Sequence, residues 1–146
     1  MNLIGYDVVP IDKSFVQEVS LSTTDLKTLV ESSDFITIHV PYTEQTKHLI
    51  DKEMLSKMKN NAFLINTSRG EVIDEEALVD CLKNKRIGGA ALDVYEVEPP
   101  TNKELLELDN IVCTPHIAAQ TKEGQELASA VIGEKIIQRL LERQTE

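Results

Sequence analysis

Three residues with chemically useful side chains each follow a short apolar run. Arg69 offers a fixed cation, Glu98 an acid and His116 an imidazole, a group that exchanges protons near neutral pH. The apolar runs read as strands at residues 62–66, 88–94 and 110–113. In a parallel α/β sheet, ligands bind outside the carboxyl ends of the strands. A cation, an acid and an imidazole at that one edge would suit a substrate with a carbonyl or carboxylate group.

The elements that would position these residues alternate between strand and helix, which predicts βαβ units and a parallel sheet. Further strands are predicted at residues 2–6 and 35–40, with a short one at 18–21. Helices are expected where a side-chain oxygen can cap free backbone N–H groups. The capping residues are Thr24 or Asp25, Asp51 and Asp74, and uncapped patterns predict a short helix at 103–108 and a long one at 121–142.

Composition excludes several classes of protein. The net charge of −10 argues against a general nucleic-acid binder and against docking on an anionic membrane. No apolar stretch approaches the length of a membrane span, and no signal peptide is found. Cys81 and Cys113 lack metal-ligand spacing, so we expect buried free thiols and no metal site. We expect a cytoplasmic protein in which His39 is structural and His48 lies on the surface.

Seven motifs in unbroken order resemble the D-isomer-specific 2-hydroxyacid dehydrogenases, a family that includes phosphoglycerate dehydrogenase. Any one of them would be weak evidence, whereas seven at compatible spacing are strong. They are GYD (5–7), SDFITIHVP (33–41), LINTSRG (64–70), VIDEEAL (72–78), GAALDV (89–94), EPP (98–100) and TPH (114–116).

The resemblance implies a Rossmann-type coenzyme domain and hydride transfer between NAD and a 2-keto or 2-hydroxy acid, with 3-phosphoglycerate as one candidate. Arg69 would grip the substrate carboxylate and polarise its carbonyl, because a guanidinium group is a planar fork of donors. His116 would give a proton to the carbonyl oxygen on reduction and take it back on oxidation. Glu98 would pair with His116 and favour the imidazolium form.

The same resemblance implies a set of cofactor-binding residues. Asp7 would accept hydrogen bonds from the adenosine ribose, which favours NAD over NADP. Asp93 matches the position on the nicotinamide side of the cofactor. The other matching positions, several of which would act through backbone groups, are Val40, Thr67, Ser68, Arg69, His116, Ile117, Ala118 and Ala119.

The pattern also departs from the family. A coenzyme domain opens with a strand and a Gly-x-Gly-x-x-Gly turn, which the six glycines of this sequence do not form. We therefore expect an incomplete α/β Rossmann domain at residues 1–120 and a helix at 121–146 that returns toward an absent substrate domain. Glu71 stands where the family often has Gly. Ala118 would crowd a close backbone approach to the cofactor.

Three hypotheses follow from these observations. The first is the C-terminal part of an NAD-dependent 2-hydroxyacid dehydrogenase, which would be a homodimer at full length. The second is a non-catalytic fragment. The third is a corepressor-like relative that binds NAD and acts through protein partners.

Overall fold

Two parallel strands and one helix form the first part of the chain. The computed structural model describes residues 1–143. Strand β1 (Leu3–Gly5) pairs with β2 (Leu21–Thr23), and helix α1 (Lys13–Glu18) connects them. The short strand expected at 18–21 is found shifted, as β2 at Leu21–Thr23, because the Asp12 side chain accepts hydrogen bonds from two backbone N–H groups and starts a helix that continues to Glu18.

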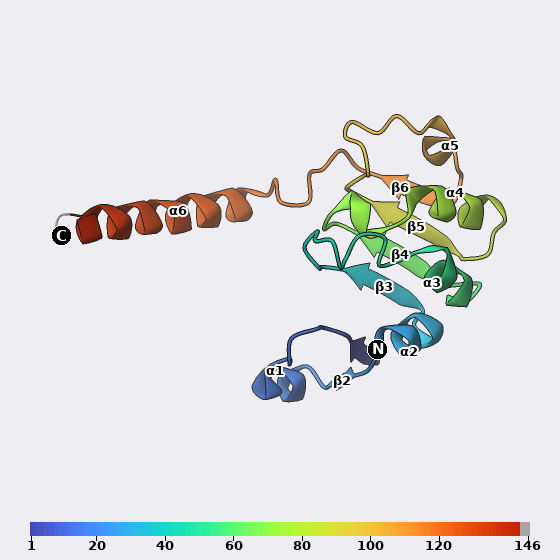
Figure 1. Ribbon diagram of the computed structural model, residues 1–146, viewed down its shortest axis with the longest axis horizontal. Coiled ribbons are helices and arrows are strands. Elements are labelled where there is room, and N and C mark those ends of the chain that lie inside the picture. Colours follow the sequence, from blue (N-terminus) through green and yellow to red (C-terminus); the bar gives the residue numbers. More distant parts are fainter. Residues whose placement is uncertain (144–146) are drawn as a thin grey trace. The chain divides into compact units, whose positions relative to one another are not determined.

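A four-stranded parallel sheet forms the larger part. Its strands pair in the order β3 (Phe35–Ile38), β4 (Phe63–Asn66), β5 (Gly89–Leu92) and β6 (Ile111–Cys113). Their arrowheads point the same way in Figure 1, so all four carboxyl ends lie at one edge. Within residues 1–143 no strand pairing joins β1 or β2 to this sheet. That agrees with a Rossmann order without its first strand, which would sit in the middle.

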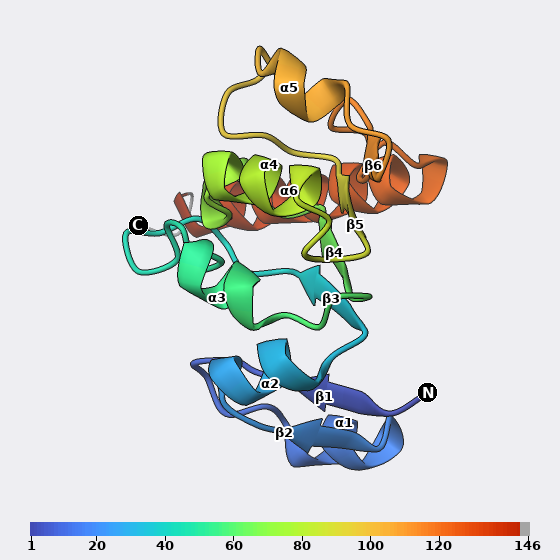
Figure 2. The same cartoon turned by 90° about the vertical axis from the view of Figure 1, so that its right-hand side faces the viewer.

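Three of the connecting helices begin at the predicted side-chain caps, and the fourth, predicted without a cap, is capped by Asn102. They are α2 (Leu26–Ser32), α3 (Lys52–Lys57), α4 (Glu75–Lys83) and α5 (Lys103–Leu106), capped by Asp25, Asp51, Asp74 and Asn102. Each cap accepts a hydrogen bond from a backbone N–H of the first helical turn, which has no partner within the helix. Figure 2 shows α3 and α4 side by side along the four-stranded sheet.

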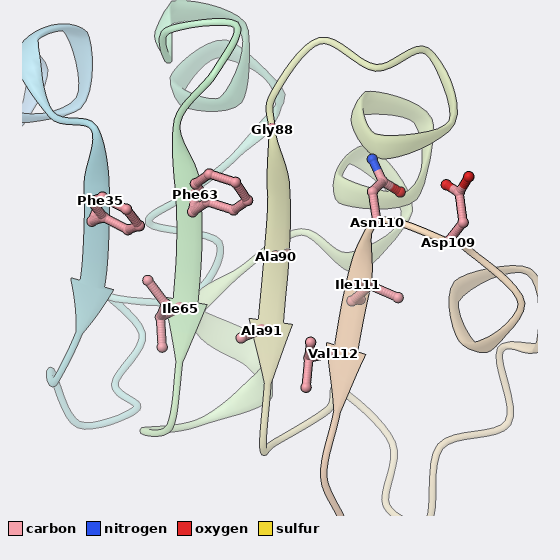
Figure 3. Close-up of a pocket in the computed structure, with 10 residues that line it drawn as sticks. All are labelled: Phe35, Phe63, Ile65, Gly88, Ala90, Ala91, Asp109, Asn110, Ile111 and Val112. Carbon is pink, nitrogen blue, oxygen red and sulfur yellow. The ribbon is translucent and has the colours of Figure 1, made fainter.

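The two faces of this sheet differ in burial. One face packs against the helices and buries the alternate strand residues Ile36, Leu64 and Leu92. The opposite face carries Phe35 and Phe63, whose stacked rings lie 5.5 Å apart between centroids (Figure 3). Phe35 is 66% exposed there, whereas Leu64 on the neighbouring strand is fully buried.

The long helix α6 (Lys122–Arg143) belongs to a second compact unit that begins at His116. It confirms the predicted helix at 121–142, and residues 144–146 of the predicted segment lie outside the described residues. No helix in the described part of the chain is long and apolar enough to cross a membrane. Of the two free cysteines, Cys81 is buried as predicted, whereas Cys113 is only half-buried.

Candidate functional site

Arg69 lies on a tight turn at the carboxyl end of β4. Asn66, the last residue of that strand, is buried, and its amide Nδ2 donates to the Arg69 carbonyl over 2.9 Å. Its Oδ1 accepts from both the backbone N–H and the hydroxyl of Ser68, over 3.0 and 2.9 Å. The Arg69 side chain is exposed, and its Nη1 donates to the Ser68 carbonyl over 2.6 Å. A buried amide thus fixes the turn that presents the guanidinium group.

Glu98 lies on the loop that follows β5. Its Oε1 accepts a hydrogen bond from the backbone N–H of Tyr95 over 3.2 Å. The Tyr95 hydroxyl donates to the Thr114 carbonyl over 2.9 Å, which connects this loop to the end of β6. Burial raises the pKa of the Tyr95 phenol, so the hydroxyl stays protonated and remains a donor. Glu98 itself is exposed.

The turn of Arg69 and the loop of Glu98 touch each other through their backbones. Gly70 is buried, and a Cβ atom built on it would lie 1.9 Å from the carbonyl carbon of Tyr95 and 2.1 Å from its oxygen. Only glycine allows this approach. The structure therefore brings the segments that carry Arg69 and Glu98 together at one edge of the sheet.

Asp93 connects three neighbouring strand ends. It is only 3% exposed, and its Oδ1 accepts from the Thr114 hydroxyl over 2.5 Å. Its backbone N–H donates to the Asn66 carbonyl over 3.0 Å. The carboxylate is thus held at the carboxyl edge of β4, β5 and β6. Its predicted contact with the nicotinamide side of a cofactor stays a prediction.

Asp7 lies apart from these residues, at the end of β1. It lines a hollow of about 530 Å³ together with Gly5, Lys13 and Thr24. Its Oδ1 accepts from the backbone N–H of Val9 over 2.9 Å, and the side chain is exposed. An acid in a hollow after a parallel strand fits the sugar of a nucleotide.

The remaining predicted cofactor positions in the first unit follow β3 and β4. Val40 is half-buried two residues after β3, and Thr67 and Ser68 form the turn after β4. They share the carboxyl edge with Arg69. This placement agrees with the predicted edge, and their contact with a cofactor stays a prediction.

His116 opens the second unit, together with the other predicted residues Ile117, Ala118 and Ala119. Its backbone is left-handed, with φ of 53°, and its carbonyl accepts from the Gln120 side chain over 3.2 Å. The backbone N–H of Gln120 donates to the Ile117 carbonyl over 2.9 Å. These bonds form a turn ahead of α6. The pairing of His116 with Glu98 stays a prediction.

A second hollow, of about 370 Å³, carries none of the predicted residues. It lies on the open face of the sheet toward the amino ends of the strands, between Phe35, Gly88 and Asn110 (Figure 3). Among residues 1–143, no cluster of three or more histidine, cysteine or acidic side chains could hold a metal ion.

Two features of the site do not follow from the sequence analysis. His48, expected on the surface, is half-buried, and its Nε2 lies 2.8 Å from Glu96 Oε1. The signal available in the sequence was a second acid, Glu96, two residues before Glu98, the acid that the family pattern singles out. Asn66 was assigned only to a strand, although a polar residue at the end of an apolar run suggests a turn-forming side chain.

Comparisons with known proteins agree with this geometry. The family described as D-isomer specific 2-hydroxyacid dehydrogenase, NAD binding domain, matches residues 1–118. The chain is 44% identical over 137 residues to the D-3-phosphoglycerate dehydrogenase of Methanocaldococcus jannaschii, covering 93% of this chain and 26% of that protein. It is 43% identical over 143 residues to the hydroxypyruvate reductase of Thermotoga maritima, covering 96% of this chain and 45% of that protein.

A solved structure shows the same fold. The D-lactate dehydrogenase of Aquifex aeolicus, complexed with NAD and lactic acid, has a TM-score of 0.82 and 34% identity. The match covers 97% of this chain and 48% of that protein, so the chain spans less than half the length of these three relatives. The chain belongs to the D-isomer specific 2-hydroxyacid dehydrogenase family and matches its NAD-binding domain.

Proposed function

We propose that the full-length protein containing this chain is an NAD-dependent oxidoreductase that interconverts a D-2-hydroxy acid and a 2-keto acid. The observation that carries the proposal is the contact between the Arg69 turn and the Glu98 loop. In this contact the backbone segments that carry the cation Arg69 and the acid Glu98 meet at the carboxyl edge of a parallel sheet, the edge at which such sheets bind ligands. The family membership supports the same reaction.

Each of the three residues has a distinct task in this proposal. The guanidinium of Arg69 binds the substrate carboxylate through paired N–H donors and polarises the adjacent carbonyl. His116 gives its proton to the carbonyl oxygen during reduction and removes it from the hydroxyl during oxidation. Glu98 pairs with His116 and favours the protonated ring. NAD, when bound, supplies the hydride chemistry.

The cofactor would be held along the carboxyl edge. Asp7 accepts hydrogen bonds from the ribose hydroxyls, and its negative charge disfavours a 2′-phosphate, so we propose NAD rather than NADP. Asp93 lies on the nicotinamide side. The positions that would line the cofactor are Val40, Thr67, Ser68, Arg69, His116, Ile117, Ala118 and Ala119.

The proposal also includes a class of substrate. The relatives named D-3-phosphoglycerate dehydrogenase and hydroxypyruvate reductase act on small acids. We propose a small 2-keto or 2-hydroxy acid for this protein as well. A homodimer in the cytoplasm is the expected setting for the full-length enzyme.

The proposal is tested first by calorimetric titration of NAD into this chain and into the full-length enzyme, followed by NADH oxidation with glyoxylate and hydroxypyruvate. We expect NAD binding and turnover from the full-length enzyme. NAD binding without turnover of any 2-keto acid would support a corepressor-like protein instead. Neither binding nor turnover would support a non-catalytic fragment.

The role of His116 is tested by its replacement with alanine in the full-length enzyme. We expect His116→Ala to lower turnover by about 10²-fold or more, because the proton transfer loses its donor. Lys122→Gln, at an exposed position of the same unit, serves as the control and should keep wild-type turnover. Unchanged turnover in His116→Ala would remove this residue from its proposed role.

A further inference from the structure

We propose that His48 and Glu96 form a positioning pair that fixes the Glu98 loop against the Arg69 turn. The inference rests on the proposed function of Arg69 and Glu98. It concerns two residues that this function does not use. Neither would touch the substrate, and both would act through the loops that carry the reacting groups.

The Glu96 carboxylate is an acceptor for two other loops. Its Oε1 lies 2.8 Å from His48 Nε2 and 3.2 Å from the backbone N–H of Glu75, the first residue of α4. The ionised Glu96 carboxylate can only accept hydrogen bonds, so His48 Nε2 is the donor. One carboxylate oxygen thus joins the segment after β3, the start of α4 and the loop after β5.

The Glu75 side chain also binds the loop that carries Glu96 and Glu98. Its Oε2 accepts from the backbone N–H of Glu96 over 3.4 Å, and its Oε1 accepts from the Asn102 side chain over 3.2 Å. Asn102 in turn caps α5. The loop that carries Glu98 is therefore bound at both ends, near Glu96 and at residue 102.

His48 is itself attached to the segment that follows Arg69. Its backbone N–H donates to the Glu71 carbonyl over 2.8 Å, and Ile50 N–H donates to the Val72 carbonyl over 3.1 Å. Its φ of 49° is left-handed, a conformation that histidine and asparagine tolerate better than most residues. A movement of Glu96 away from His48 would thus separate the Glu98 loop from residues 69–72.

The side chains of this pair are half-buried, whereas the core side chains are fully buried. The side chains of His48 and Glu96 are 38% and 33% exposed, whereas core residues such as Leu64 and Leu78 are fully buried. An exposed pair contributes little to global stability. Loss of the pair should therefore loosen the loop without unfolding the sheet.

The experiment compares three variants of the full-length enzyme. His48→Asn keeps a residue that tolerates the left-handed backbone but shortens the side chain by one bond, so the donor no longer reaches Glu96. His48→Gln carries an amide nitrogen the same number of bonds from the backbone as Nε2 and should restore the hydrogen bond. Lys47→Gln changes the exposed neighbouring residue and is the matched control.

The first readout is hydrogen exchange, measured by mass spectrometry on peptides that cover residues 94–102. We expect His48→Asn to lower protection there by about tenfold, with protection of residues 62–66 unchanged, because a hydrogen bond to a charged group is lost locally. His48→Gln should restore protection, and Lys47→Gln should leave it unchanged. Unchanged protection in His48→Asn, an equal loss throughout the sheet, or no rescue by His48→Gln would each overturn the proposal.

The second readout is steady-state kinetics with glyoxylate and NADH. We expect His48→Asn to lower kcat about tenfold with the KM for NADH unchanged, because misplaced groups slow the reaction more than they weaken cofactor binding. His48→Gln should recover kcat. A raised KM for NADH with unchanged kcat would overturn the positioning role. If the wild-type enzyme shows no turnover, the proposed function fails, and the exchange experiment still decides whether His48 and Glu96 position the loop.

Discussion

The four-stranded sheet and the two-stranded sheet differ in how their carboxyl edges are supported. Among the residues whose burial is described, 1–142, all of the buried side chains lie between Val30 and Leu105, in or around β3–β6. Residues 1–29, which include β1 and β2, are exposed or half-buried throughout. Arg69 and Glu98 therefore stand on loops anchored to a packed core, whereas Asp7 stands beside a hollow with little apolar support.

In the proposed function the two sheets have different chemical tasks. Catalytic groups must be held in place before the substrate arrives, because misplacement by a fraction of an ångström slows the reaction. The Asn66 turn, the Gly70 contact and the Asp93 bonds provide that order in the four-stranded part. In the proposed function, Asp7 would bind a nucleotide sugar, which needs only a hollow with a well-placed acceptor, and Asp7 lines such a hollow.

The largest effect is expected from a change in the packed core. Leu64→Ala should lower the free energy of unfolding by about 3–5 kcal/mol, because it removes a fully buried side chain and leaves a cavity. Leu21→Ala, in the two-stranded sheet, should cost about 1 kcal/mol or less, since that residue is half-buried. Urea denaturation of both variants checks the contrast. Equal losses would show that the two parts are supported alike.

A methyl group at Gly70 tests the contact between the two catalytic loops. Gly70→Ala should cost about 3 kcal/mol, because its Cβ would overlap the Tyr95 backbone, which cannot rotate away like a side chain. Gly133→Ala is the matched control, since its Cβ would meet nothing within 4 Å in α6, and it should not destabilise the protein. Thermal denaturation measures both, and a Gly70→Ala variant as stable as Gly133→Ala would refute the close approach.

Asp7 should affect binding rather than stability. Asp7→Ala is expected to weaken NAD binding by about tenfold, the effect of removing hydrogen bonds to a charged acceptor, while the melting temperature stays unchanged. Calorimetric titration of the full-length enzyme measures the affinity. Unchanged NAD affinity would exclude Asp7 from the ribose site.

The smallest effect is expected from a helix cap. Hydrogen bonds from the backbone N–H and then the hydroxyl of Thr28 lower the pKa of Asp25 below its usual 3.8. A carboxylate with a depressed pKa in the folded state stabilises the protein above pH 3.8, and this contribution is lost as the pH falls through the folded pKa. Asp25→Asn caps the helix without a charge. The stability of the wild type relative to this variant, measured as the difference in unfolding free energy, should therefore be lower at pH 2 than at pH 7. A difference that is the same at both pH values would contradict the assignment.

The local elements follow largely from the sequence, because their causes are local. Asp25, Asp51 and Asp74 begin helices as predicted, since a cap needs only its own neighbouring N–H groups. The short strand predicted at 18–21 lies instead at Leu21–Thr23, because the helix that begins after the Asp12 cap continues to Glu18. Short apolar runs fit both states equally well.

The contacts between loops do not follow from the sequence in the same way. Gly70 appears in the sequence only as the last residue of the motif 64–70, and its contact with Tyr95 depends on two loops 25 residues apart along the chain. His48 reads as a surface residue until the fold places Glu96 beside it. The stacking of Phe35 on Phe63 on the open face likewise depends on the pairing of β3 with β4. Such features depend on how neighbouring strands assemble.

The most direct test of the proposed reaction is the rate of 2-keto acid reduction by Arg69→Lys in the full-length enzyme. Lysine keeps the charge but loses the planar fork that binds a carboxylate with two parallel hydrogen bonds. We predict that kcat/KM for glyoxylate falls by about 10²-fold or more, while the Kd for NADH stays within about twofold. An unchanged kcat/KM would contradict the assignment of Arg69 to the substrate and, with it, the proposed active site.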